Sequence, residues 1–477
     1  MSLPSVKMKS PGVIKSATQK PCTGGRLWPP ASLRAKRPRA GGQRRPPVQL
    51  SAHRHPHPVP LLIALEKHRI NRVALPLTVN IRVDYLAMTR EIYLDNNATT
   101  PVAPEVVDAM LPYLRECYGN PSSAHRKGLE AERALRASRA TAARTLGVEE
   151  SEIVFTACGT EGNNLALRGV ARALKREGNH IITSQVEHPA VLETCRDLET
   201  EGFRVTYLSV TQTGTLAPEA VLEAITDETI LVSLMHVNNE TGVIFPVEEM
   251  ARQVKQANPR IVFHSDGVQA IGKLQPHLAD IDLYSLSGHK FHAPKGVGAL
   301  VVRRGVRIKP VMTGGGQERG RRSGTENLAG IVGLARAMEL ACTDLAAKQK
   351  HFQALRERFI AGLQELPQAR LNSPTESVPA TVSVAFMGVP GEVLLNALEA
   401  EGVCVSAGSA CASAHKSHRR RSHVLTAMGL EPAVIDSTLR FSFSRYTTLE
   451  EIDEAVRVLK QTVPQLQAVA QRTRAQH

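Results

Sequence analysis

Short apolar runs and longer amphipathic stretches alternate along the central part of the chain. Apolar runs such as 153–155, 230–235 and 297–302 are separated by segments in which apolar residues recur every three or four positions. The runs are typical of buried strands, and the amphipathic segments are typical of helices. Strands that alternate with helices indicate a mostly parallel sheet covered on both faces. We therefore expect an α/β fold for this region.

The last third of the chain has a different order of elements. A helical stretch over 328–363 is followed by an apolar strand at 381–386, a helix over 392–401, a second apolar run from Val403, and a strand at 439–445 before a final helix from Glu450. This order predicts a smaller α+β domain. We assign residues 88–345 to a large domain, whose first residues can join the small one, and 346–477 to the small C-terminal domain.

The net charge of +14 comes from one end of the chain. Residues 1–87 contain 16 Lys or Arg, two acidic residues and 12 of the 29 prolines, whereas the rest contains 43 basic and 43 acidic residues. A segment of this composition cannot bury enough apolar surface to fold, so we expect a disordered basic extension. Because the body is neutral, a nucleic-acid partner is not expected.

Four interpretations of residues 1–87 fit this composition. The favoured one is that translation begins at Met88 and that the upstream residues are a mis-assigned start. The others are a transit peptide, which its proline content opposes, a basic interaction tail, and a nucleic-acid-binding arm, which is the most remote. We expect a cytoplasmic protein, or a mitochondrial matrix protein if the extension is a transit peptide.

The seven cysteines and the longest apolar run restrict the protein class further. The cysteines form no CxxC pair, which argues against a disulfide framework or a structural zinc site, and we expect no metal. The best uninterrupted apolar run has seven residues and contains a proline, so we expect no membrane span.

Polar residues with chemical potential follow the predicted strands. In a parallel sheet, ligands bind at the carboxyl ends of the strands. Lys290 follows such a strand, where its amine can be desolvated and become a nucleophile. A strand-end aspartate together with a later strand-end lysine suggests pyridoxal phosphate, with the lysine forming a Schiff base and the aspartate facing the ring nitrogen. The strand-end groups are Gly159 and Thr160, His188, Asn239, Asp266 with Gln269, and Ser287 to Lys290.

Three other segments have weaker signals. Thr160, near a helix expected from Glu161, is suited to phosphate, although an ordinary N-cap is as good an interpretation. The glycine-rich basic segment 313–327 is suited to an anion or to solvent. Segment 267–273 matches GxxxxGK, but Leu274 replaces the Ser or Thr of a nucleotide-binding loop.

Cys411 lies in a loop of small residues next to His and Arg. Nearby positive charge lowers the pKa of a thiol, so this setting favours a reactive cysteine over a buried structural one. Cys404, in an apolar strand, is the candidate for the structural role.

A series of motifs resembles the group I cysteine desulfurases, the NifS/IscS type of the class V aminotransferases. The resemblance covers residues 90–460 in unbroken order. It includes EIYLDNNATTP, TEGNNLAL, VEHPAVLE, MHVNNETG, HSDGVQAIGK, SLSGHK, GGGQERGRRSGT and GSAC. It implies a homodimeric enzyme with a large domain, built on a seven-stranded sheet, that binds pyridoxal phosphate. L-Cysteine would become L-alanine and a persulfide destined for an acceptor such as an iron–sulfur scaffold, or for tRNA thiolation.

The resemblance also implies roles for individual residues. Lys290 would bind the cofactor covalently, His188 would stack on its ring and assist proton transfer, and Cys411 would take the sulfur. Arg440 would bind the substrate carboxylate, with Asn239 close by. The remaining cofactor contacts would be Asp266 to the ring nitrogen, Asn239 and Gln269 to the ring and its phenolic oxygen, and Gly159, Thr160, Ser287, His289 and the second subunit's Thr325 to the phosphate.

One departure from the family pattern follows Cys411, and one enzymatic alternative stays open. The segment between Cys411 and Ser422 is longer and more basic than is usual in the family, which leaves the acceptor open. A selenocysteine lyase or another class V aminotransferase would use the same scaffold. An aminotransferase would not need Cys411, so its replacement by serine separates the two readings.

Overall fold

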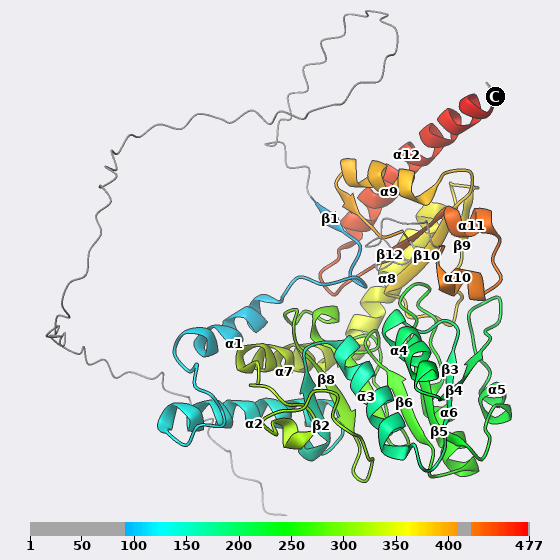
Figure 1. Cartoon of the computed structure of the whole chain (residues 1–477). Helices are drawn as coiled ribbons and strands as arrows, with labels where there is room; N and C mark the ends of the chain where they lie inside the picture. Colours follow the sequence, from blue (N-terminus) through cyan, green and yellow to red (C-terminus); the bar gives the residue numbers. More distant parts are fainter. Residues whose placement is uncertain (1–90, 408–420, 476–477) are drawn as a thin grey trace, which may run out of the picture. The chain divides into compact units, whose positions relative to one another are not determined.

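The computed structural model describes residues 91–407 and 421–475 (Figure 1). The predictions for residues 1–87, for a start at Met88 and for Cys411 concern positions outside these ranges. All the described residues belong to one compact unit.

Within the described residues, the larger part of the fold is built on a seven-stranded sheet. The strand order is β2-β8-β7-β6-β5-β3-β4, and β8 alone runs antiparallel to its neighbours. The prediction of an α/β fold with a mostly parallel seven-stranded sheet is therefore confirmed. The strands are β2 (Ile153–Thr156), β3 (His180–Ser184), β4 (Arg204–Leu208), β5 (Thr229–Met235), β6 (Val262–Asp266), β7 (Leu283–Ser287) and β8 (Gly298–Val302).

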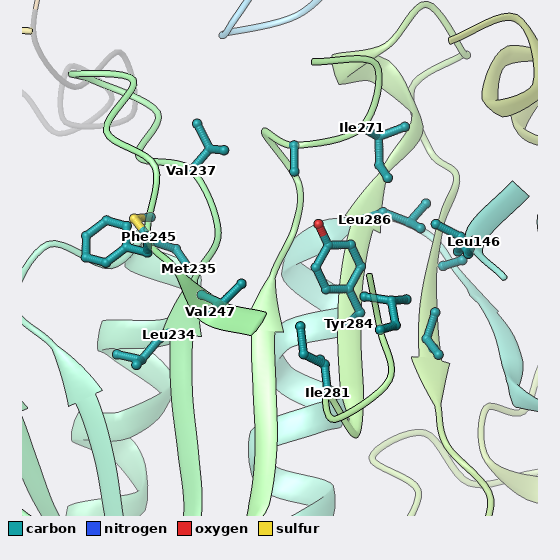
Figure 2. Packing of buried hydrophobic residues seen from close by; sticks show 14 of the residues in the cluster. Leu146, Leu234, Met235, Val237, Phe245, Val247, Ile271, Ile281, Tyr284 and Leu286 are labelled. Carbon is teal, nitrogen blue, oxygen red and sulfur yellow. The ribbon is translucent and has the colours of Figure 1, made fainter. Parts of the chain in front are cut away.

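Helices cover both faces of this sheet (Figure 1). Successive residues of a strand point to opposite faces, so neighbours such as Leu283 and Tyr284 belong to different apolar clusters. Figure 2 shows Tyr284 within the cluster formed with Leu286 and Ile271. One face carries α3 (Gly159–Leu174) and α4 (Pro189–Thr200); the other carries α1 (Pro104–Arg115), α2 (Arg126–Leu146), α5 (Pro218–Glu223), α6 (Val247–Ala257) and α7 (Leu328–Cys342).

A second, smaller part has its own antiparallel sheet and apolar core. Its sheet has the order β12-β10-β9, and a separate parallel pair joins β1 to β11. The chain therefore enters the described structure beside a strand of the small part. The elements are β1 (Ile92–Tyr93), α8 (Leu345–Leu363), β9 (Ala369–Leu371), β10 (Thr381–Phe386), α9 (Gly391–Ala400), β11 (Val403–Cys404), α10 (His423–Ala427), α11 (Pro432–Asp436), β12 (Thr438–Ser442) and α12 (Leu449–Ala475).

Two predicted helices have different bounds in the structure. The stretch 328–363 is not one helix, because α7 ends at Cys342 and Asp344 adopts a left-handed φ of 49° before α8 begins. A non-glycine residue in this region interrupts the helical hydrogen-bond pattern. The helix expected from Glu161 begins two residues earlier, at Gly159, so its first turn lies directly after the β2 strand.

Candidate active site

The strand-end residues singled out in the sequence lie along one edge of the large sheet. Strands β3, β5, β6 and β7 are parallel, so their carboxyl ends lie at the same edge. His188, Asn239 and Asp266 lie at or just after three of these ends, and the short helix Gly288–Lys290 follows the fourth. The helix α3 starts at the same edge after β2, which brings Gly159 and Thr160 to it.

The amine of Lys290 is held by backbone carbonyl groups. Its Nζ donates to the oxygens of Asn97 at 2.8 Å and of Ala98 at 2.9 Å. These carbonyls belong to the segment that follows β1, far from Lys290 in the sequence. An amine in contact with such acceptors is fixed in place within a half-buried environment.

Asn97 is the centre of this arrangement, and the strand-end argument did not identify it. Its backbone oxygen also accepts from Gln269 Nε2 at 3.0 Å, and its Nδ2 donates to Thr381 Oγ1 at 2.9 Å. Its backbone N–H donates to Ser442 Oγ at 2.9 Å. The run of polar residues after a short strand was the only sequence signal for Asn97. The role of a backbone carbonyl cannot be predicted from the type of residue that carries it.

Asp266 is oriented by two donors. Asn163 Nδ2 donates to Oδ2 at 2.7 Å, and the backbone N–H of Val268 donates to Oδ1 at 3.0 Å. Each carboxylate oxygen has further lone pairs that can accept from a protonated ring nitrogen. Asn163 was also missed; its signal is a polar side chain on the buried face of α3, one turn after Gly159.

His188 is the N-cap residue of α4. Its Nδ1 accepts from the backbone N–H of Ala190 at 3.0 Å. Burial, with a smaller contribution from the positive charge of Lys290, lowers the pKa of His188 although Asp266 opposes this. The ring is therefore neutral at pH 7, and because Nδ1 is an acceptor, the ring proton lies on Nε2.

The start of α3 and the end of β7 form a cradle suited to a phosphate. A Cβ at Gly159 would lie 2.5 Å from Cγ2 of Val268, which follows β6, and 3.4 Å from Cβ of Ser287, so glycine permits the close approach of the helix start to both strand ends. The buried hydroxyl of Ser287 has no hydrogen-bond partner among the described residues. The first N–H groups of a helix bind anions, and together with the Asp266 carboxylate they fit pyridoxal phosphate.

The structure gives less support to the other three predicted phosphate contacts, Thr160, His289 and Thr325. Thr160 is exposed, and the Nδ1 atom of His289 lies 3.2 Å from Thr99 Oγ1. Burial lowers the pKa of His289 to about 4, so this ring is also neutral. Thr325 is exposed and lines a separate cleft with Phe155 and Gly296.

Arg440 reaches the same edge from strand β12 of the small part. Its side chain is 3% exposed; one terminal nitrogen donates to Asp95 Oδ1 at 2.7 Å and the other to the backbone oxygen of Asn239 at 3.0 Å. Its Nε has no partner in the described part of the chain. A guanidinium with an unused donor at a polar site is suited to bind a carboxylate.

The segment that carries Cys411 has both of its ends near this site. Before it, Ser406 and Arg440 exchange backbone hydrogen bonds of 3.2 and 2.7 Å. After it, Ser422 Oγ donates to Glu240 Oε2 at 2.5 Å, and His423 Nε2 lies 2.8 Å from the backbone oxygen of Glu187. Position 411 itself lies outside the described residues.

Two negative findings concern the described residues only. They contain no cluster of three or more His, Cys, Asp or Glu side chains arranged to hold a metal ion. None of their helices is long and apolar enough to cross a membrane.

Comparison with known proteins gives a consistent picture. The family model described as aminotransferase class-V matches residues 92–455. A cysteine desulfurase of Trichormus azollae is 48% identical over 383 residues, which is 80% of this chain and 94% of that protein. The cysteine desulfurase IscS of Methanosarcina thermophila is 47% identical over 79% of this chain and 93% of its own. A solved NifS-like protein has a TM-score of 0.74 and 42% identity, covering 79% of this chain and 100% of its own.

Proposed function

Because this chain belongs to the class V aminotransferases and is a pyridoxal phosphate-dependent cysteine desulfurase, we propose that the residues at the carboxyl edge of its large sheet convert L-cysteine to L-alanine. The observation that carries this proposal is the position of the Lys290 amine beside Asn97 and Ala98, at the edge that also holds Asp266 and His188. The selenocysteine lyase and aminotransferase alternatives lack comparable support, since the relatives named above are cysteine desulfurases.

The cofactor supplies an electron-withdrawing ring that makes the α-proton of a bound amino acid acidic. Lys290 would hold it covalently through Nζ. The Lys290 amine, which the carbonyls of Asn97 and Ala98 orient, would also be the base for the α-proton of the substrate. Asp266 would keep the ring nitrogen protonated, and Ser287 with the first turn of α3 would hold the phosphate.

His188 and Arg440 act directly on the substrate. Arg440 binds the carboxylate with its unused Nε and with the terminal nitrogen that now contacts Asp95. His188 is neutral and carries its proton on Nε2, so it can donate that proton to the product carbon. Asn239 shapes the same pocket through its backbone oxygen, which fixes the Arg440 guanidinium.

Cys411 is the sulfur acceptor in this proposal. Its thiolate attacks the substrate sulfur, an S–S bond forms, the C–S bond breaks, and the electron pair stays on the substrate carbon, which is then protonated to give alanine. The anchors at Ser406 and His423 support this role, because they hold the two ends of the segment beside Arg440 and His188.

The assembly and the partner are further parts of the proposal. We infer a homodimer in which Thr325 reaches the phosphate of the second subunit. Exposed apolar side chains at the end of α1 (Leu114), in the following connection (Tyr118) and at the start of α2 (Leu129) support such an interface. The persulfide would pass to an acceptor protein, such as an iron–sulfur scaffold or a tRNA-thiolating system, in the cytoplasm.

The test compares two cysteine variants of the full chain. Wild type, Cys411→Ser and Cys404→Ser are purified, their visible absorption is recorded, and alanine and sulfide released from L-cysteine are measured with a reducing thiol. We expect a yellow protein in all three, and loss of both products in Cys411→Ser alone. Cys404 is the matched control because it lies in β11, a few residues before the same segment.

Two outcomes would overturn the proposal. A colourless wild type would contradict the assignment of Lys290. Full alanine and sulfide release by Cys411→Ser would contradict the role of Cys411 and favour the lyase interpretation.

A further inference from the structure

Lys273 is a buried cation close to the candidate active site. It is 9% exposed, and its Nζ donates to Asn97 Oδ1 at 2.9 Å and to Gln269 Oε1 at 2.7 Å. Both of these acceptors are uncharged amide oxygens. It is the lysine of the GxxxxGK segment, for which neither a nucleotide site nor the proposed reaction provides a role.

An ammonium group can only donate hydrogen bonds, and this property orients both amides that it touches. Gln269 must turn its oxygen towards Lys273, so its Nε2 faces the backbone oxygen of Asn97 at 3.0 Å. Asn97 must likewise turn Oδ1 towards Lys273, which leaves its Nδ2 for Thr381 Oγ1 at 2.9 Å and the backbone oxygen of Asn239 at 3.1 Å. Without the ammonium, Asn97 Oδ1 and Gln269 Oε1 would both lose this donor, and each amide would be held on its nitrogen side only.

The same two residues determine where Lys290 lies. The Asn97 backbone oxygen accepts from both Gln269 Nε2 and Lys290 Nζ. Fixing the Asn97 side chain therefore fixes the carbonyl that receives the Lys290 amine. This chain of contacts runs from Lys273 through Asn97 to Lys290, and every donor–acceptor distance in it lies between 2.7 and 3.1 Å.

We propose that Lys273 is a positioning residue of the desulfurase, which in its ammonium form orients Asn97 and Gln269 and adds a positive charge close to Lys290. The inference rests on the proposed role of Lys290 as the lysine that binds the cofactor. Lys273 itself touches neither the substrate nor the reacting atoms in this scheme.

The charge of Lys273 gives the proposal a spectroscopic signature. Burial first, and then the positive charges of Lys290 and Arg440, lower the pKa of Lys273 to about 7. The pKa of His292 is lowered mainly by burial, and Lys273 adds a smaller part. Lys348 and Arg445 line the same cleft as Lys273 and Lys290. Because like charges disfavour each other's protonated forms, Lys273 also disfavours protonation of the Lys290 nitrogen when that nitrogen holds the cofactor.

The experiment compares Lys273→Met with Lys348→Met in the full-length holoenzyme. Lys348 is the matched control, because it lines the same cleft but donates to the carbonyls of Leu340 and Ala341 at the end of α7 and contacts neither Asn97 nor Gln269. The pH dependence of the visible absorption band is titrated, and kcat and KM for L-cysteine are measured. For Lys273→Met we expect the midpoint of the pH titration of the visible band to rise by about one pH unit. We also expect kcat to fall about tenfold, with KM changed much less.

The outcomes separate this inference from the proposed function. A wild type without a visible band would contradict the Lys290 assignment. A wild type with the band, together with a Lys273→Met titration and kcat indistinguishable from those of Lys348→Met, would overturn the role of Lys273. If Lys273→Met does not fold, Lys273→Gln is used instead, because it removes the charge and keeps amide donors. An unchanged midpoint of the absorption titration in this variant would overturn the proposal. A raised midpoint with a smaller loss of kcat would support it.

Discussion

Two buried charged regions of this molecule are built in opposite ways. Between α2 and the segment after β8, Arg139 donates to Glu318 at 2.7 and 2.9 Å and to the backbone oxygen of Ile153 at 2.7 Å, while the N–H of Phe155 donates to the same carboxylate. Neither charged side chain has a buried polar atom without a partner among the described residues. At the carboxyl edge of the sheet, by contrast, the buried atoms Arg440 Nε and Ser287 Oγ have no hydrogen-bond partner among the described residues.

The difference separates a structural from a functional use of buried charge. A buried polar atom without a partner costs about 1 to 3 kcal/mol, so each such atom needs an explanation, and a ligand that completes the contact is one explanation. The Arg139–Glu318 pair is complete and needs no ligand. In the region around Arg440, two buried atoms have no partner among the described residues, and in the function proposed above the substrate and the cofactor would supply these contacts.

The largest effect is expected when the complete pair is broken. Glu318→Gln leaves Arg139 buried without its counter-charge, which typically costs about 3 to 5 kcal/mol in the free energy of unfolding. Urea denaturation of the variant measures this loss. Glu249→Gln is the matched control, because Glu249 pairs with Arg252 at an exposed position and its loss should leave the unfolding midpoint unchanged. Equal midpoints for the two variants would show that Arg139 and Glu318 are not a structural pair.

An intermediate effect is expected when the incomplete region is altered at Arg440. Arg440→Lys keeps the charge but loses the planar set of donors, so kcat/KM for L-cysteine should fall about 10- to 100-fold, corresponding to about 1.5 to 3 kcal/mol of a charged hydrogen bond. The fall should lie mainly in KM. Arg356→Lys is the control: Arg356 is buried and bonded to Ser377, but it lies outside the site. Unchanged kinetics in Arg440→Lys would exclude the carboxylate role.

The smallest effect concerns Glu187, which is buried beside His188. Burial raises its pKa from 4.5 to about 8, although Met235 N–H and Ser184 Oγ donate to it. The folded protein therefore keeps a proton that the unfolded chain releases; the resulting stability is full below pH 4.5 and is lost as the pH rises towards 8. Glu187→Gln should remove this dependence and raise stability at pH 7 by about 1 to 2 kcal/mol. Unfolding free energies measured from pH 5 to 8 test this, and parallel curves for variant and wild type would contradict it.

The sequence predicted the parts of the site that depend on sheet topology. Lys290, Asp266 and His188 follow parallel strands, and the topology alone brings them to one edge. Asn97 and Lys273 could not be found in this way. Asn97 acts mainly through its backbone carbonyl, and Lys273 matters because folding buries it between two amides.

The fold was predicted with similar strengths and gaps. The buried strands and the helix over 126–146 follow from apolar periodicity, which burial on a sheet or a helix face imposes. The break at Asp344 could not be predicted from apolar periodicity, because amphipathic character continues across it. A single residue with left-handed backbone geometry is enough to separate α7 from α8. The pairing of β1 with β11 depends on a contact between distant segments, which local pattern cannot reveal.

The contacts of Asn97 with distant segments determine when this protein can first become active during its synthesis. Asn97 needs Ser442 for its backbone N–H and Thr381 for its side chain, and Lys290 needs Asn97. A nascent chain that has exposed the whole large sheet therefore still lacks the carbonyl position that holds the Lys290 amine. Only after nearly all of the sequence has left the ribosome can the segment beginning at Ile92 pair with β11 and complete the site. A partly made chain therefore lacks the contacts that place Asn97 beside Lys290.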